Sequence, residues 1–429
     1  MRRAWMSLAL VFAIVAVACT GEEDGLEPTD TGGGPVEIIF WHGNTGRAGR
    51  ALKELVAEFN DTHPDIQVTE QFYGNTDRAL QKVETAVASG EYPDIAYLYG
   101  SWAANIAESP KVLALNDLIE SDPEFAWEDF WPAEQLAATV EGRIIAVPAL
   151  VDNLAVLYNK DLFDEAGVEY PAADWTWDDF RAAAKAITDP EAKIFGWEFA
   201  ADASEDTVWH WEAMLWEAGG DILNEDNTQA AFNSEAGVQA LEMVRAMAID
   251  DKSVYIDTTN TKRWDLFNSG NIGLYVTGPW DLPDLTVNYG VQVMPSFGDP
   301  ANHQTISGPD NWVLFDNGET RSKAAFEFIK WYTSGEQDLK NAMVSATLPI
   351  RQSELELPEY KDLLKEYPGI DVFVENMNNA VKARPITPAY PQISEALGNA
   401  IVSVLLGKAD AKTALDQAAQ ETNSILATA

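Results

Sequence analysis

Short apolar runs alternate with stretches of helical spacing in the N-terminal quarter of the folded chain. The first run, VEIIFWHG at 36–43, is rich in β-branched and aromatic residues and ends in glycine, which predicts a buried strand. In 47–64, apolar residues recur three or four positions apart and predict a helix that stops at a proline. Strands follow at 66–73 and 93–100, with a helix at 76–90 between them. This order predicts an α/β domain with a mainly parallel sheet.

A second block of the same kind begins with GRIIAVPALVDNLAVLYNKDLFDEAGV at 142–168. Its two β-rich stretches flank 148–152, which we interpret as a crossing between domains. Thr176 is the expected N-cap of a helix at 175–188, and Asp179 completes a variant of the capping box. The other predicted elements are a strand at 194–202, helices at 208–221 and 234–250, the segment 262–285, a strand at 287–298, and mostly helices after 321, one of them at 372–384.

The residues that follow these strands are candidates for ligand binding. In open α/β sheets, ligands lie beyond the carboxyl ends of the strands. The candidates from the first sheet are Trp41, His42 and Asn44 after the first strand, and Tyr99, Ser101 and Trp102 after the third.

The N-terminal segment has the layout of a secretory signal peptide. MRRAWMSL supplies two positive charges, and ALVFAIVAVA is apolar but too short to span a bilayer. Small residues then lead to Cys19, the single cysteine, which cannot form an internal disulfide. Cysteine directly after Ala-Val-Ala resembles a bacterial lipobox, so we expect a signal peptide at 1–18, lipid on Cys19 and a flexible acidic linker at 19–35. The alternative is an ordinary signal peptide or anchor that happens to contain a cysteine.

The composition narrows the classes of partner. The chain has 69 Asp and Glu against 28 Lys and Arg, a formal net charge of −41. Such a chain repels nucleic acid and anionic lipid headgroups, so neither is an expected partner, and the acidity is consistent with a saline habitat. With 46% hydrophobic residues it is not a disordered acidic tail, and its length predicts two domains. Lipid on Cys19 is therefore the expected tether to the membrane.

Several segments follow one another in the order of a known family. They are FWHG, PDIAYLYGSW, IAVPALVDNLAVLYNKDLFDEAGV, WTWDDF, SGNIGLYVTGPWDL and VNYGVQVMPSFG. Together with the lipobox, they resemble the extracellular sugar-binding proteins of bacterial ABC importers, the class that includes maltose-binding protein. The resemblance implies a type II periplasmic-binding-protein fold, with a ligand cleft between two α/β lobes joined by hinge strands. Lobe 1 is expected at 36–148 plus 299–348, and lobe 2 at 150–298 plus 352–429.

The resemblance also implies a function. The protein is expected to capture a di- or oligosaccharide of the maltose, maltodextrin or trehalose kind and to deliver it to ABC permease subunits by hinge closure. The implied function is binding without chemical conversion, in which no bond is made or broken. We therefore expect no enzymatic activity, no cofactor and no metal. The expected location is outside the cell, lipid-anchored at the outer face of the cytoplasmic membrane, and the expected state is a monomer.

Aromatic and carboxylate side chains suit such a ligand. Aromatic planes cover the apolar faces of sugar rings, and charged partners form strong hydrogen bonds with the hydroxyls. Trp280, in GPWDL, matches a family position that stacks on the ligand, and Asp281 follows it. Trp211 is favoured over Trp209 and Trp216, because the latter two are seven apart and share a helix face. The remaining candidates are Asp152 and Asn153 at the crossing, Gly308, Asp310, Asn311, Arg351 and Tyr390.

Other functions stay open at this point. A secreted glycoside hydrolase is also exported and rich in tryptophan, and it needs two carboxylates at a set distance. A polyamine-binding protein uses acids and aromatics in a similar way. A metal carrier is disfavoured by four scattered histidines and one cysteine. The identity and linkage of the sugar cannot be predicted from these residues.

Overall fold

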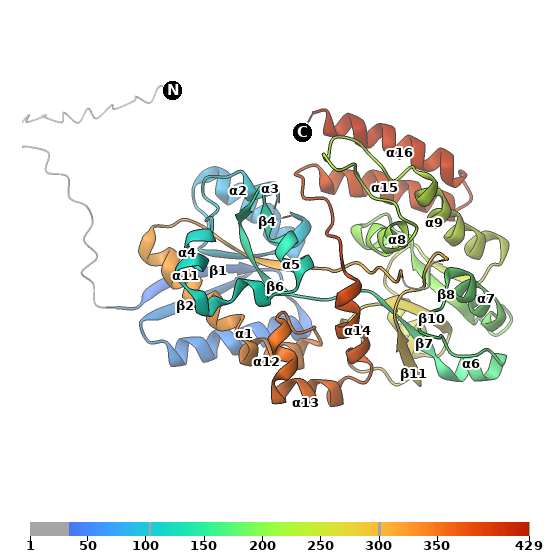
Figure 1. Cartoon of the computed structure of the whole chain (residues 1–429), viewed down its shortest axis with the longest axis horizontal. Coiled ribbons are helices and arrows are strands. Elements are labelled where there is room, and N and C mark those ends of the chain that lie inside the picture. The colour runs from blue at the N-terminus through green and yellow to red at the C-terminus, as the bar shows by residue number, and fades with distance from the viewer. Residues whose placement is uncertain (1–33, 103, 299–301, 429) are drawn as a thin grey trace, which may run out of the picture. The chain divides into compact units, whose positions relative to one another are not determined.

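The structure, a computed structural model, describes residues 34–428 except 103 and 299–301. The predicted signal peptide, Cys19 and nearly all of the predicted linker lie outside the described residues. The chain from Pro35 onward forms one compact unit built on two mixed β-sheets with helices packed against them (Figure 1). Within the described residues, no helix has both the length and the apolar character needed to cross a membrane.

The first sheet has the strand order β2-β1-β3-β12-β6. Its first three strands pair in parallel, as the sequence predicts, whereas β12 returns from far along the chain and pairs antiparallel with both β3 and β6. The strands are β1 (Val36–His42), β2 (Ile66–Phe72), β3 (Ile95–Tyr99), β6 (Ala146–Leu150) and β12 (Asp310–Leu314).

Amphipathic helices cover this sheet. The predicted helical face of α1 is buried, and α1 packs beside α12 and α11. The helices are α1 (Gly46–Thr62), α2 (Thr76–Ser89), α11 (Glu319–Tyr332) and α12 (Gly335–Ser345). Short elements link β3 to β6, namely η1 (Gly100–Trp102), α3 (Ala104–Ala107), α4 (Asn116–Ser121), η2 (Pro123–Phe125), η3 (Trp127–Asp129), α5 (Pro132–Ala137), β4 (Thr139–Val140) and β5 (Arg143–Ile144).

The second sheet has the order β11-β7-β10-β8-β9. Here β10, β8 and β9 are parallel, while β7 runs antiparallel to both of its neighbours. The strands are β7 (Ala155–Asn159), β8 (Phe195–Ala200), β9 (Val254–Asp257), β10 (Ile272–Thr277) and β11 (Tyr289–Gln292).

The helices of the second sheet include the predicted capping box. The Thr176 side chain accepts from the Asp179 backbone N–H, and the Asp179 carboxylate accepts from the Thr176 N–H in return. At the far end, α15 and α16 lie side by side and pack on α8 and α9 (Figure 1). The elements are α6 (Lys160–Ala166), α7 (Trp177–Ile187), α8 (Glu205–Glu217), α9 (Glu235–Arg245), the π-helix η4 (Ala246–Asp250), α10 (Arg263–Asn268), η5 (Pro279–Asp281), α15 (Tyr390–Leu405) and α16 (Ala411–Leu426).

The segment between the sheets pairs with two others. Val151 forms a β-bridge with Leu348, and Asn153 forms one with Ser307. The buried Asn153 amide also donates to the Phe373 carbonyl at 2.8 Å and so links this segment to α14 (Ile370–Asn376). The elements near it are η6 (Gln352–Glu356), α13 (Pro358–Glu366), α14 (Ile370–Asn376) and η7 (Met377–Asn379). The residue limits of the two lobes stay a prediction.

One predicted helix is shorter in the structure than in the sequence analysis. The expected helix at 372–384 ends with η7 at Asn379, and 380–389 is irregular. Pro385 explains part of this difference, because its ring disfavours the helical conformation of Arg384 before it. The irregular backbone matters for the site, since Arg384 reaches the main cavity described below.

A buried acid stabilises the paired segments. Glu134 of α5 is fully buried, and its carboxyl hydrogen-bonds the Ser307 hydroxyl, which also lies 3.0 Å from the Asp152 carbonyl oxygen. One hydroxyl has a single proton to donate, so Ser307 serves both partners when Glu134 is protonated and donates to it. Burial, the largest cause, raises the pKa of Glu134 to about 8, which agrees with this arrangement.

This protonation predicts a stability that depends on pH. A carboxyl with its ordinary pKa of 4.5 in the unfolded chain loses its proton far below the folded value of about 8. Between these values the folded state holds the extra proton, so the free energy of unfolding falls as the pH rises, by about 4 kcal/mol from this group. Glu134→Gln keeps a donor to Ser307 and does not titrate, so its thermal midpoint is expected to fall less between about pH 5 and about pH 8. The exposed Glu128→Gln is the control, and equal slopes in all three proteins would contradict the assignment.

Candidate functional site

A cavity of about 570 Å³ lies at the carboxyl end of β3 and the start of β12. The first sheet and its following turns supply one wall, and the position of these residues past the strand ends agrees with the rule for open α/β sheets. The wall is lined by Tyr99, Trp102, Asp152, Gly308 and Asp310.

Residues of the second sheet and the C-terminal region supply the facing wall. The turn after β8 and the first turns of α8 contribute half of them, η5 and the N-terminal part of α15 contribute four, and the irregular segment 380–389 contributes Arg384. These residues are Ala203, Ser204, Glu205, Asp206, Trp209, Trp280, Arg384, Pro391, Ser394 and Glu395.

Two aromatic pairs line the cavity. The rings of Trp209 and Trp280 have centroids 5.7 Å apart and an interplanar angle of 33°. On the other wall, Tyr99 and Trp102 meet edge to face at 4.9 Å. Gly278 allows the placement of Trp280, because a Cβ at this position would come within 1.9 Å of the Trp280 ring. The cavity therefore offers aromatic surface on both walls.

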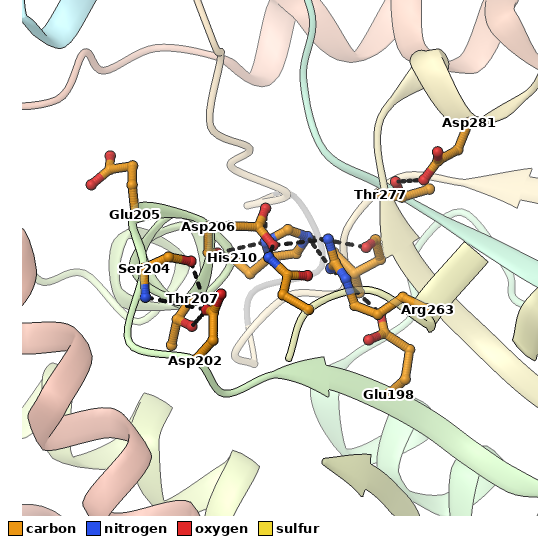
Figure 2. A network of polar contacts seen from close by, with 12 residues as sticks. Glu198, Asp202, Ser204, Glu205, Asp206, Thr207, His210, Arg263, Thr277 and Asp281 are labelled. Carbon is orange, nitrogen blue, oxygen red and sulfur yellow. Dashed lines mark hydrogen bonds and ion pairs between the residues drawn. The ribbon is translucent and has the colours of Figure 1, made fainter. Parts of the chain in front are cut away.

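The turn before α8 is ordered by its own polar groups. Asp202 Oδ1 accepts from the Ser204 N–H at 3.2 Å and from the Thr207 hydroxyl at 3.0 Å (Figure 2). Glu205 and Asp206 then occupy the first turn of α8, where the helix dipole favours negative charge. The local sequence thus explains why two acids lie together at this wall.

Glu205 is held by three donors. Its carboxylate accepts from Arg384 Nη1 at 2.8 Å, from the Tyr390 hydroxyl at 2.9 Å and from the Ser394 hydroxyl. Burial would lower the pKa of Arg384, but the charge of Glu205 is among the causes that raise it above its ordinary value. Arg384 is therefore the positive partner of Glu205.

Asp206 belongs to a separate network, drawn in Figure 2. It accepts from Arg263 Nη2 and from the Asn260 amide, each at 2.8 Å, and lies 3.3 Å from His210. Burial alone would raise its pKa, but His210 and Arg263 hold the pKa of Asp206 below its ordinary value. In the same figure, the Glu205 carboxylate points away from this network, and Glu198 lies on its other side, 3.6 Å from Arg263.

Asp152 and Asp310 also line the cavity, and the charge of Arg384 lowers the pKa of both acids, but by less than burial raises it. Asp310 accepts from the Tyr97 hydroxyl, and neither acid forms an ion pair with a described residue. The buried Asp152 Oδ1 has no hydrogen-bond partner in the described part of the chain. Burial raises the pKa of Asp310 to about 7, and burial together with the charges of Asp310 and Glu134 raises the pKa of Asp152 well above its ordinary value.

Gly308 is needed for the close packing of this wall. Its backbone N–H donates to the Asp152 carbonyl oxygen at 3.2 Å. A Cβ on Gly308 would lie 2.3 Å from Asp152 Oδ1 and 3.1 Å from the Trp209 ring. Both neighbours line the cavity, so a side chain here would displace the groups that shape it.

Four candidates after the strands of the first sheet do not line the cavity. His42 is fully buried and hydrogen-bonded to Glu70 at 2.8 Å. Trp41 packs on Tyr73, and Asn44 donates its backbone N–H to the His42 ring. Ser101 is buried within η1.

Five further candidates also lie outside the cavity lining. Asn153, Asn311 and Arg351 are buried, and their side chains donate to backbone carbonyl groups; Arg351, for example, donates to Thr333 at 2.7 Å. Asp281 accepts from the hydroxyls of Tyr275 and Thr277, behind Trp280. Tyr390 is fully buried and supports the cavity indirectly through its hydrogen bond to Glu205.

The prediction for α8 and the structure differ in which tryptophan reaches the cavity. Trp209 lines it, whereas Trp211 is fully buried. Residues Thr207–Glu217 of α8 are all buried, so the helix has no solvent-facing side and seven-residue spacing does not identify its core face. Sequence reasoning also missed Glu205, Asp206 and Arg384. Two features of the sequence could have pointed to these residues: two acids at the start of a helix, and an arginine directly before a proline.

The described residues contain no group of three or more His, Cys, Asp or Glu side chains arranged to hold a metal ion. The site therefore combines aromatic faces, carboxylates and one guanidinium. These groups can bind and orient a polar ligand with apolar faces.

Comparisons with known proteins agree with this architecture. The protein from Arthrobacter globiformis that binds cyclic α-maltosyl-1,6-maltose is 29% identical, with a TM-score of 0.80 over 92% of this chain and 100% of that one. An ABC substrate-binding protein of Listeria monocytogenes, solved with cycloalternan, is 27% identical, with a TM-score of 0.80 over 92% and 99%. The sn-glycerol-3-phosphate-binding periplasmic protein UgpB of Brucella melitensis is 24% identical over 408 residues, which cover 92% of this chain and 94% of that protein.

The family follows from the sequence itself. Residues 42–338, more than half of the chain, match the family described as bacterial extracellular solute-binding protein. The two sheets with their helices form the two-lobed α/β fold of type II periplasmic binding proteins, as the resemblance implied. The chain belongs to the bacterial extracellular solute-binding protein family.

Proposed function

We propose that this protein captures a di- or oligosaccharide in its main cavity and delivers it to the permease of an ABC importer. The observation that carries the proposal is a cavity with an aromatic pair on each wall and carboxylates between them. Aromatic planes suit the C–H faces of sugar rings, and the acids accept from hydroxyls. The name of the Arthrobacter relative says that it binds a cyclic oligosaccharide, and the Listeria relative was solved with one. Both relatives support the same class of cargo.

Closure of the two walls is the proposed mechanism. Asp152 and Asp310 belong to one wall and Trp209 and Trp280 to the other, so a ligand that contacts both stabilises the closed arrangement. The permease then recognises the closed form. Binding without chemical conversion is part of the proposal, as are a monomeric state and a lipid anchor on Cys19 outside the cell.

A phosphate-bearing cargo, which the name of the Brucella relative suggests, fits the cavity less well. Phosphate groups are recognised by arginines and other donors of positive charge. The cavity has five carboxylates, and its single arginine, Arg384, is already bound to Glu205. The charge of the cavity therefore favours a cargo without phosphate.

Ligand-induced stabilisation tests the proposal. A ligand that binds only the folded protein at a hundredfold excess over its Kd adds about 2.7 kcal/mol to the free energy of unfolding. We expect residues 20–429 to gain thermal stability and to change tryptophan fluorescence with at least one member of a panel of mono-, di- and oligosaccharides. The panel includes sn-glycerol 3-phosphate and spermidine, and a response to either of these without any response to sugars would overturn the sugar assignment. Oligosaccharide hydrolysis would revive the hydrolase alternative.

Trp280 provides the matched mutational test. Trp280→Ala removes one of the paired aromatic planes, so we expect the affinity for the responding sugar to fall at least about tenfold, measured by calorimetry. Trp331→Ala removes a partly buried tryptophan on α11, far from the cavity lining, and should leave the Kd unchanged. Equal affinity in the Trp280 variant and the parent protein would remove this ring from the site.

Lipid anchoring is tested separately through Cys19. Cys19→Ser removes the thiol that the predicted lipobox would acylate, so the protein is expected to leave the membrane fraction and to lose the mass of the lipid. Fractionation and intact-mass spectrometry of the expressed full chain measure both effects. Membrane retention by the serine variant would point to an ordinary signal anchor.

A further inference from the structure

The cavity lining contains five acids and one arginine, Arg384, whose charge also acts on Asp152 and Asp310. Of its five acids, Glu205 is bound by Arg384, and Asp206 by Arg263 and His210. Glu395 is exposed at the rim, where water screens its charge. Asp152 and Asp310 remain, and within the described chain neither lies in an ion pair.

These two acids are also close enough to affect each other. The charge of Asp310 is the second largest cause of the raised pKa of Asp152, after burial. The buried Asp152 Oδ1 has no hydrogen-bond partner among the described residues, and it lies against the Cα of Gly308, where the site tolerates no side chain. A desolvated carboxylate pair of this kind is stabilised by a positive group placed beside it.

A second group at the cavity lacks a partner. Trp209 is only 8% exposed and lines the cavity, and its Nε1 donates to no described residue. An indole N–H is a donor only, so its complement is an acceptor such as a hydroxyl oxygen. The cavity thus offers acceptors for a cation on one wall and a donor for a hydroxyl on the other.

We propose that the sugar bound here carries a protonated amino group, which lies between Asp152 and Asp310. This inference rests on the proposed sugar-binding function and specifies its substrate class. An ammonium donates charge-assisted hydrogen bonds and neutralises the acids, whereas the hydroxyl of a neutral sugar leaves their charge uncompensated or requires their protonation. The aromatic rings of both walls add cation–π attraction for the same group.

Matched sugar pairs test this inference without any mutation. Trehalose is compared with trehalosamine, and maltose with maltosamine, because each pair differs by one hydroxyl replaced by an amine. Calorimetry at low ionic strength, at a pH where the amine is protonated, is expected to give a Kd at least about tenfold lower for the amino sugar of the responding pair. Acetylation of the amine removes its charge and should abolish the gain.

Variants then locate the amine. Asp152→Asn and Asp310→Asn keep the side-chain size and remove one charge each, so either should reduce the amino-sugar preference and affect the neutral twin much less. Glu395→Gln removes a solvent-screened acid of the same cavity and should have a smaller effect. Glu108→Gln, which removes an exposed charge outside the cavity lining, should have none.

The outcomes separate this inference from the proposed function. Equal or tighter binding of the neutral sugars would overturn the amino-sugar inference while sugar binding itself stands. An amine preference that persists in both aspartate variants would overturn the assignment to this pair. Binding of spermidine without binding of any sugar would overturn both the inference and the proposed function.

Discussion

The pairing of the segment around Asp152 with the segment around Ser307 is the constraint on which the site depends. The Asp152 carbonyl accepts from the Gly308 N–H, and Asn153 pairs with Ser307, so backbone hydrogen bonds hold the two segments together. The same residues present Asp152 Oδ1 and Gly308 to the cavity. Because backbone pairing and side-chain presentation come from the same few residues, the place where the sheets are joined is also the floor of the binding site.

This arrangement concentrates buried acids. Each desolvated carboxylate opposes folding at neutral pH unless it is paired or protonated. The structure uses both solutions, since Glu205 and Asp206 have cationic partners while Glu134 is neutral against Ser307. The acidity of the cavity is thus distinct from that of the surface, where acids are solvated and impose little cost.

Much of the fold could be predicted from residue patterns. The parallel strands β1, β2 and β3 and the Thr176 capping box depend on contacts within a short stretch of chain, so spacing and local chemistry identify them. Among the candidate site residues, the structure brings together Tyr99, Trp102, Asp152, Trp280, Gly308 and Asp310, whereas other strand-end candidates such as His42 and Ser101 do not line the cavity. The placement of the residues that line it follows from the general rule that ligand sites lie beyond strand ends.

Packing between segments far apart in the chain decided the positions of the other site residues. The spacing of the tryptophans favoured Trp211, but α8 is buried on every side, and its packing places Trp209 at the cavity and Trp211 in the core. Arg384 lies within the irregular segment 380–389, and its place beside Glu205 depends on the packing of α15 against α8. The sequence by itself determined the family, the order of strands and helices and the strand-end candidates, because these depend on local periodicity and turn chemistry. Tertiary structure alone decided which acids are paired and which are not, because that depends on distances between residues far apart in the chain.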